Sequence, residues 1–149
     1  MNAKKRIVPE VAHSHMCVLG ITSEFDEFRF CNLLHSELGL DFAVSEQIPI
    51  DIHGKTLGEY PIYTCYDERE MVLYELVSNT LINEVKLVSF LDSITFFLRC
   101  SFDTYAEDTS EQIITRLKKL QAVLFVQRIE QGNYSTKQRA VLRKLFSNV

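Results

Sequence analysis

The chain of 149 residues lacks tryptophan and contains only five glycines, four cysteines and three prolines. The glycines stand at positions 20, 39, 54, 58 and 132 and build neither GxGxxG nor GxxxxGK(S/T), so the common phosphate-binding loops are excluded. No apolar run approaches the roughly 20 residues that a membrane-spanning helix requires. We therefore expect no nucleotide-binding loop of these types and no membrane association.

The four cysteines, at positions 17, 31, 65 and 100, are scattered and form no CxxC pair. A domain of this length buries roughly 70% of its unfolded surface and does not need disulfides. Lys4, Lys5 and Arg6 open the chain, but polar residues and Pro9 interrupt the apolar stretch that a secretory signal needs. We therefore expect one cytoplasmic domain over residues 1–149, with reduced thiols and no cofactor.

The formal net charge of −4 conceals an uneven distribution. Residues 7–112 carry 19 acidic side chains against 5 basic ones, whereas residues 113–149 carry 8 basic side chains against Glu130 alone. This asymmetry is the one electrostatic indication of a partner. We interpret residues 1–10 as a flexible basic N-terminus and residues 135–147 as a basic amphipathic helix.

Periodicity and capping residues predict the elements of the N-terminal part. Alternating side chains predict a strand over residues 11–20. Ser23, with Asp26 three residues later, predicts the N-cap of a helix, and Gly39 predicts its C-terminal end. A short strand is expected over residues 40–44.

Turn residues and further alternation predict the rest of the fold. Residues 45–59 are interpreted as a long polar loop because they contain Pro49, Gly54 and Gly58. Helices enter the strand-rich chain at only three points, which favours an α+β fold. We expect an antiparallel or mixed sheet of five to six strands with about three helices, mainly on one face. The other predicted elements are strands over residues 61–66, 71–78, 88–100 (Phe90, Ile94, Phe96, Leu98 and Cys100 on one face) and 122–129, a helix from Asp108 or Thr109 to Leu120, and a C-terminal helix from Ser135 or Thr136.

The segment INEVKLVSF, residues 82–90, resembles the motif that names the uncharacterised bacterial IPExxxVDY family. Ile82, Glu84 and Val88 match the motif, and Asn83, Ser89 and Phe90 stand where it has Pro, Asp and Tyr. Residues 20–40 and the YELVSN segment at 74–79 similarly resemble the family's N-terminal half and the strand before its signature. The resemblance covers roughly residues 12–130; it implies a bacterial, cytosolic protein and no catalytic residue.

Asn83 and Glu84 also have a physical interpretation that is independent of the family. An Asn side chain favours a turn or a helix N-terminus, where backbone N–H groups favour a carboxylate such as that of Glu84. We expect a turn that sets the register of the strand after it. A binding role for Glu84 is the alternative.

His13, His15 and Cys17 alternate along the first predicted strand, so two imidazoles and a thiolate point to one side. This donor set suits a tetrahedral cation such as Zn²⁺, with Cys31 or His35 as a fourth ligand. Structural zinc sites usually carry closer Cys pairs, so a solvated polar strand face is the favoured interpretation. Cys31 and His35 also form a Cys–His pair on one helix, but this spacing is more typical of packing than of nucleophile activation.

Basic side chains concentrate in two predicted helices. Together they form a candidate patch for RNA or for an acidic protein. The alternative is internal, with the two helices lying over the chain's own acidic part. The candidate binding residues are Lys118 and Lys119 in the first helix and Lys137, Arg139, Arg143 and Lys144 in the second.

We therefore predict a non-catalytic cytoplasmic module that binds another protein. Its contact would be an exposed sheet edge, the 45–59 loop or the charged C-terminal helix. The alternative is an RNA-associated protein that uses the basic helices, and a small enzyme of unknown class comes third. A homo-oligomer is compatible with each of these functions.

Overall fold

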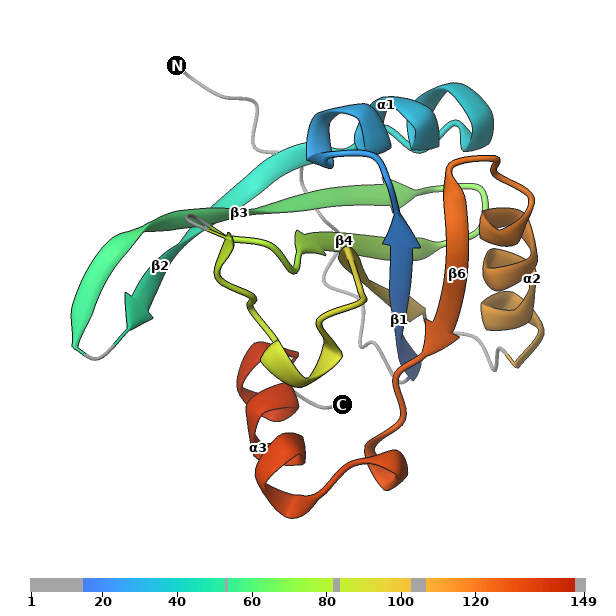
Figure 1. Ribbon diagram of the computed structural model, residues 1–149. Coiled ribbons are helices and arrows are strands. Elements are labelled where there is room, and N and C mark those ends of the chain that lie inside the picture. The colour runs from blue at the N-terminus through green and yellow to red at the C-terminus, as the bar shows by residue number, and fades with distance from the viewer. Residues whose placement is uncertain (1–14, 53, 82–83, 103–106, 147–149) are drawn as a thin grey trace.

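A computed structural model describes residues 15–52, 54–81, 84–102 and 107–146, which form a six-stranded antiparallel sheet and three α-helices (Figure 1). The strand order is β2-β3-β4-β5-β1-β6. The predicted α+β class and the predicted order of elements are confirmed. The bounds are β1 (His15–Ser23), α1 (Glu27–Leu38), β2 (Ala43–Ile52), β3 (Lys55–Asp67), β4 (Val72–Ser78), β5 (Phe96–Phe102), α2 (Glu107–Lys118), β6 (Val123–Arg128) and α3 (Thr136–Leu145).

The sheet has a hydrophobic core on each face. Helices α1 and α2 cover one face and build the first core, in which Phe30 stacks on Phe96 with ring centroids 4.5 Å apart. Helix α3 and the segment between β4 and β5 cover the other face and build the second core around Phe97. Successive strand residues point to opposite faces, so the neighbours Phe96 and Phe97 belong to different cores. Two of the three helices thus share a face, and α3 lies on the opposite one.

The first helix begins at a different cap from the expected one. Asp26, not Ser23, is the N-cap, and its side chain accepts a hydrogen bond from the Arg29 N–H at 2.8 Å. The Ser23 hydroxyl instead donates to the Ala122 carbonyl at 2.8 Å, which ties the end of β1 to the approach to β6. Gly39 ends the helix with φ of 69°, as predicted.

The predicted strand over 40–44 exists but begins later and is much longer than expected, and the predicted loop over 45–59 is wrong. Residues 43–59 belong to the long hairpin of β2 and β3, with Gly54 at φ of 78° in its turn. Pro49 did not exclude a strand because β2 is an edge strand, where the missing N–H is tolerated. The alternation of Ile48, Ile50 and Ile52 with polar residues or Pro49 was the sequence signal for this strand.

The predicted strand over 88–100 is wrong in its first half, because β5 begins at Phe96. Phe96, Leu98 and Cys100 face the first core, as one face of a strand should. Ile94 and Phe90 pack in the second core instead. Gly20 permits this approach, since a Cβ on Gly20 would overlap the Ile94 side chain.

Asn79 holds the segment before β5 in this conformation. Its side chain is fully buried, accepts a hydrogen bond from the Val88 N–H at 2.8 Å, and donates to the carbonyls of Leu91 at 2.9 Å and Ile94 at 3.0 Å. Its backbone N–H donates to the Thr95 carbonyl at 2.9 Å. Asn79 is the last residue of the YELVSN segment, so the residues of this segment fold the signature that follows it.

The described residues at the start of the signature, from Glu84 onward, lie in a turn, as expected. Thr80 and Lys86 form an antiparallel bridge, and the Leu81 N–H donates to the Val85 carbonyl at 2.7 Å. Glu84 lies in this turn with φ of 61°, a backbone conformation that residues other than Gly seldom adopt. Residues 82–83 lie outside the described residues.

The C-terminal elements match the prediction in type but not in burial. β6 is an edge strand rather than the expected core strand, and Leu124 and Phe125 are 60% and 57% exposed. Helix α3 begins at the predicted cap, Ser135, whose hydroxyl accepts from the Gln138 N–H in a capping box. The expected flexible N-terminus over residues 1–10 lies outside the described residues, as does residue 147.

Replacement of Asn79 by Ala should destabilise the fold strongly. The substitution leaves the Val88 N–H and the Leu91 and Ile94 carbonyls without their side-chain partner, and each buried unsatisfied group costs about 1–3 kcal/mol. We expect a loss of about 3 kcal/mol in the free energy of unfolding, measured by urea denaturation. Asn133→Ala, at an exposed asparagine, is the control and should change it by less than about 0.5 kcal/mol. Equal effects of the two variants would contradict the role of Asn79.

Candidate interaction surfaces

Strand β2 is the outermost strand on one side of the sheet, and among the described residues β3 alone pairs with it. Its exposed side chains include Val44, at 50% exposure, together with Glu46 and Gln47. An edge strand presents unpaired backbone N–H and C=O groups, which form a template for another extended chain. This open edge is the expected sheet-edge surface.

The far part of the β2–β3 hairpin extends beyond the rest of the sheet. β2 pairs with β3 from Ala43 to Ile52, whereas β3 pairs with β4 only between Tyr63 and Asp67. The part of the hairpin nearest its tip is therefore a two-stranded ribbon, which projects beyond the rest of the sheet in Figure 1. A two-stranded ribbon by itself is marginally stable in water.

The direction of the backbone groups at this edge follows from two prolines. Antiparallel pairs alternate between hydrogen-bonded and non-hydrogen-bonded kinds. Gln47 lies opposite Pro61, which has no N–H with which to complete a hydrogen-bonded pair. The N–H and C=O of Gln47 therefore face the open edge. Pro49 faces the same way two residues later and has no N–H, so it ends the row of outward donors.

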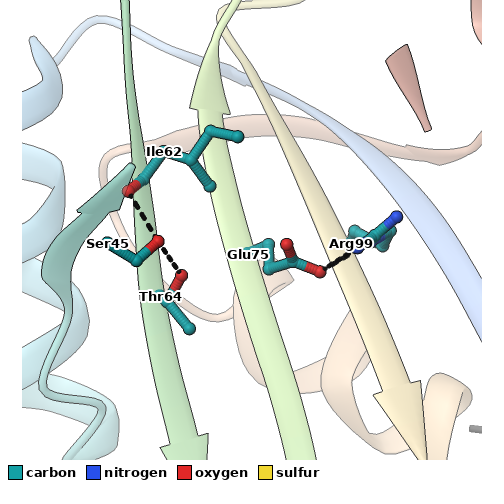
Figure 2. A network of polar contacts seen from close by, with 5 residues as sticks. All are labelled: Ser45, Ile62, Thr64, Glu75 and Arg99. Atoms are coloured by element: carbon teal, nitrogen blue, oxygen red, sulfur yellow. Dashed lines mark hydrogen bonds and ion pairs between the residues drawn. The ribbon is translucent and has the colours of Figure 1, made fainter. Parts of the chain in front are cut away.

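Side-chain contacts stabilise the ribbon where it joins the rest of the sheet, on the face that α3 covers. At the bulge of β2, the Ser45 hydroxyl donates to the Ile62 carbonyl at 3.2 Å and lies 2.6 Å from the Thr64 hydroxyl (Figure 2). Glu75 is the register partner of Thr64, and its Oε1 accepts from Arg99 Nε at 2.7 Å. Arg99 pairs with this half-buried carboxylate, and we interpret the row as structural.

The structure does not bring the predicted basic residues into one patch. Lys118 and Lys119 lie at the end of α2, over the first core, just before β6. The basic residues of α3 lie over the second core and follow the other end of β6 (Figure 1). The sheet and the length of β6 therefore separate the two groups.

Part of the basic C-terminal third does contact the acidic part of the chain. Arg116 lies 3.5 Å from Glu70, and Arg128 lies 2.8 Å from Glu111. The predicted binding residues differ from these two arginines. Lys118, Lys119, Lys137, Arg143 and Lys144 are exposed, and none forms an ion pair with a residue that the structure describes.

The remaining predicted binding residues are Arg139 and Glu84. The Arg139 guanidinium donates to the Thr136 hydroxyl at 3.2 Å on its own helix. Glu84 is exposed in its turn rather than at the start of a helix, so no series of helical N–H groups surrounds its carboxylate.

The expected metal donors are described only in part. His13 lies outside the described residues, and within the described ranges no group of three His, Cys, Asp or Glu side chains is placed to hold a metal ion. His15 and Cys17 do share a strand face, as predicted, but His15 stacks on Phe102 with ring centroids 6.2 Å apart. Cys17 contacts Cys100 on the next strand.

Cys31 is not activated for nucleophilic chemistry. Burial, and to a smaller extent the nearby Glu27 carboxylate, raise the pKa of its thiol to about 11. Glu27 Oε2 accepts a hydrogen bond from the Tyr63 hydroxyl at 2.8 Å. His35 is exposed on the same helix.

Comparisons with known proteins add no relative, since neither a scan against protein-family models nor a search of curated proteins finds a match. Within the described residues, no helix combines the length and the apolar character needed to cross a membrane.

Two features of the structure were missed at the sequence level. The β2 edge had a signal in the alternating isoleucines, which the nearby Pro49 and Gly54 obscured. The contact between Cys17 and Cys100 had none, because residues so far apart in the sequence meet only through strand pairing.

The raised pKa of Cys31 predicts slow alkylation. At pH 8 its thiolate fraction should be roughly 100-fold smaller than that of a thiol at the ordinary value of 9.0. We expect its reaction with iodoacetamide, followed by mass spectrometry, to accelerate about tenfold per pH unit up to about pH 10. The same cysteine in the urea-unfolded chain is the control and should level off near pH 9. A folded-state rate that also levels off near pH 9 would contradict the prediction.

Proposed function

We propose that this protein is a non-catalytic interaction module of the cytoplasm, which binds an extended segment of another protein along the open edge of β2. The observation that carries the proposal is the position of β2, whose outer edge no other described strand covers. We also propose that the chain is a divergent member of the IPExxxVDY family, on the motifs given above.

Strand addition fits the chemistry of this edge. In this mode of recognition, main-chain hydrogen bonds supply affinity and alternate side chains supply specificity. The outward groups of Gln47 supply the hydrogen bonds, and exposed Val44 supplies apolar contact. A bound strand would also convert the two-stranded ribbon into a three-stranded sheet, which removes the cause of its marginal stability.

The contact is limited at both ends. β2 has a register shift between Val44 and Glu46, and Pro49 removes an outward donor, so an added strand would pair regularly only with residues 46–48 and not continue towards the tip. Such a short contact is typical of a transient interaction rather than a permanent complex.

Replacement of Gln47 by Pro should abolish partner binding without unfolding the protein. The variant removes an N–H that faces the open edge and places a ring there, so the β2–β3 pairing is retained. We expect about a tenfold or greater loss of affinity, since the ring blocks the approach of the added strand as well as removing one hydrogen bond. Gln47→Ala, which keeps the N–H, is the matched control and should bind as the parent does.

The measurement is an affinity pull-down from the native cell with the three tagged chains, scored for both protein and RNA. A protein captured by the parent and by Gln47→Ala, but not by Gln47→Pro, supports the proposal. Capture that is equal for all three chains contradicts it. Circular dichroism melting checks that Gln47→Pro is folded.

A second candidate function, RNA association through α3, has one observation in its favour. Lys137, Arg143 and Lys144 are exposed and form no ion pair within the described part of the chain. Unpaired cations on one helix suit a phosphate backbone, whose binding depends steeply on salt.

Replacement of all three residues by Gln tests this candidate. If α3 binds RNA, the affinity for a single-stranded oligonucleotide should fall, and the slope of log K against log salt should decrease by up to about 2. Lys118→Gln/Lys119→Gln removes charge from the far side of the sheet and is the control. Equal loss in both variants would indicate a response to net charge rather than a site on α3.

A further inference from the structure

Cys17 and Cys100 lie directly opposite each other on the central strands β1 and β5. Both side chains face the first core, and the two sulfur atoms are joined by a hydrogen bond. The other two cysteines are elsewhere. Cys65 is on β3, opposite Tyr74 of β4, and Cys31 is on α1. Among the described cysteines, only Cys17 and Cys100 therefore lie opposite each other on paired strands.

Backbone hydrogen bonds give the spacing of this pair. The Val18 carbonyl accepts from the Ile129 N–H on the β6 side of β1, whereas the Ile21 carbonyl accepts from the Thr95 N–H on the β5 side. The backbone N–H and C=O groups of successive strand residues point to opposite sides. Those of Cys17 therefore point to β5, and its pair with Cys100 is of the hydrogen-bonded kind. The Cα atoms of such a pair are about 5.5 Å apart, within the roughly 4.4–6.8 Å that a disulfide spans.

The two thiols have different environments, which suit an attacking and a resolving role. Cys17 is partly exposed, and its pKa is lowered by the hydrogen bond from Cys100 and, less strongly, by the charge of Arg128, against the effect of burial. Cys100 is fully buried, and burial raises the pKa of its thiol. An oxidant therefore reaches Cys17 first, and Cys17 carries the larger thiolate fraction.

We propose that Cys17 and Cys100 are a redox-active pair that hydroperoxides convert into a reversible intramolecular disulfide. The Cys17 thiolate attacks an oxygen of hydrogen peroxide, the O–O bond breaks, and the hydroxide that leaves takes a proton and becomes water. The Cys100 sulfur then attacks the sulfur of the Cys17 sulfenic acid. The S–O bond breaks, and its oxygen leaves as a second water with the Cys100 proton. Two thiols are oxidised in total and one peroxide is reduced.

A disulfide at this position can be reduced again by thiol–disulfide exchange with an external dithiol. The oxidised state is thus a temporary modification of an otherwise reduced protein. It would link the two central strands of the sheet and is independent of the β2 edge.

The test oxidises the full, folded chain with a small excess of hydrogen peroxide, blocks the remaining thiols, and maps the fragments by mass spectrometry without reduction. We expect the parent, which has four free cysteines, to keep two and to yield the fragment joined through Cys17 and Cys100. Dithiothreitol should restore all four. Cys31→Ser is the matched control and should form the same joined fragment.

Two variants keep the proposal falsifiable, because Cys100→Ala changes a fully buried side chain of the core whereas Cys17→Ser changes a partly exposed one. Neither variant should form an intramolecular disulfide. Cys17→Ser should keep its three remaining cysteines as thiols, and Cys100→Ala should keep its thiols or accumulate sulfenic or sulfinic acid at Cys17. Circular dichroism checks their folding. The proposal is overturned if the folded parent forms no Cys17–Cys100 fragment, if oxidation stops at Cys17, or if the disulfides that form join two chains.

Discussion

The buried side chain of Asn79 is the constraint on which the second face of this protein depends. One amide connects the end of β4 to the backbone of Val88, Leu91 and Ile94 and so folds the segment that leads into β5. Those residues cannot then continue the strand, and they pack beside Phe97 instead. Without this anchor, the face opposite α1 and α2 would keep only the cover that α3 provides.

The segment that carries the motif has a structural role in this fold. The residues before and within the signature form an anchor, a turn and a packed segment. Glu84, the acidic residue of the motif, is exposed in the turn and has no hydrogen-bond partner among the described residues. These contacts indicate that this segment of the chain has a role in folding. The surfaces available for binding lie at the edges of the sheet.

The two edges of the sheet have different characters. β6 is short, bulged where Leu124 is inserted, and packed beside α2. β2 is long and projects with β3 as a ribbon, and Pro49 interrupts its outward donors. Bulges and prolines are the usual means by which edges avoid uncontrolled pairing. The bulge at Ser45 and Pro49 therefore confine an added strand to the short stretch of β2 between them.

The sequence by itself determined the class of fold, the order of elements, both helix termini at Gly39 and Ser135, and the unequal distribution of charge, because these follow from local periodicity, capping chemistry and composition. It did not determine the long hairpin, since Pro49 and Gly54 are equally typical of loops and of edge strands. Only the tertiary structure decided that Ser23 binds Ala122 rather than capping α1, that the basic helices lie on opposite faces, and that Cys17 meets Cys100. Each of these depends on contacts between residues far apart in the chain, which no local pattern specifies.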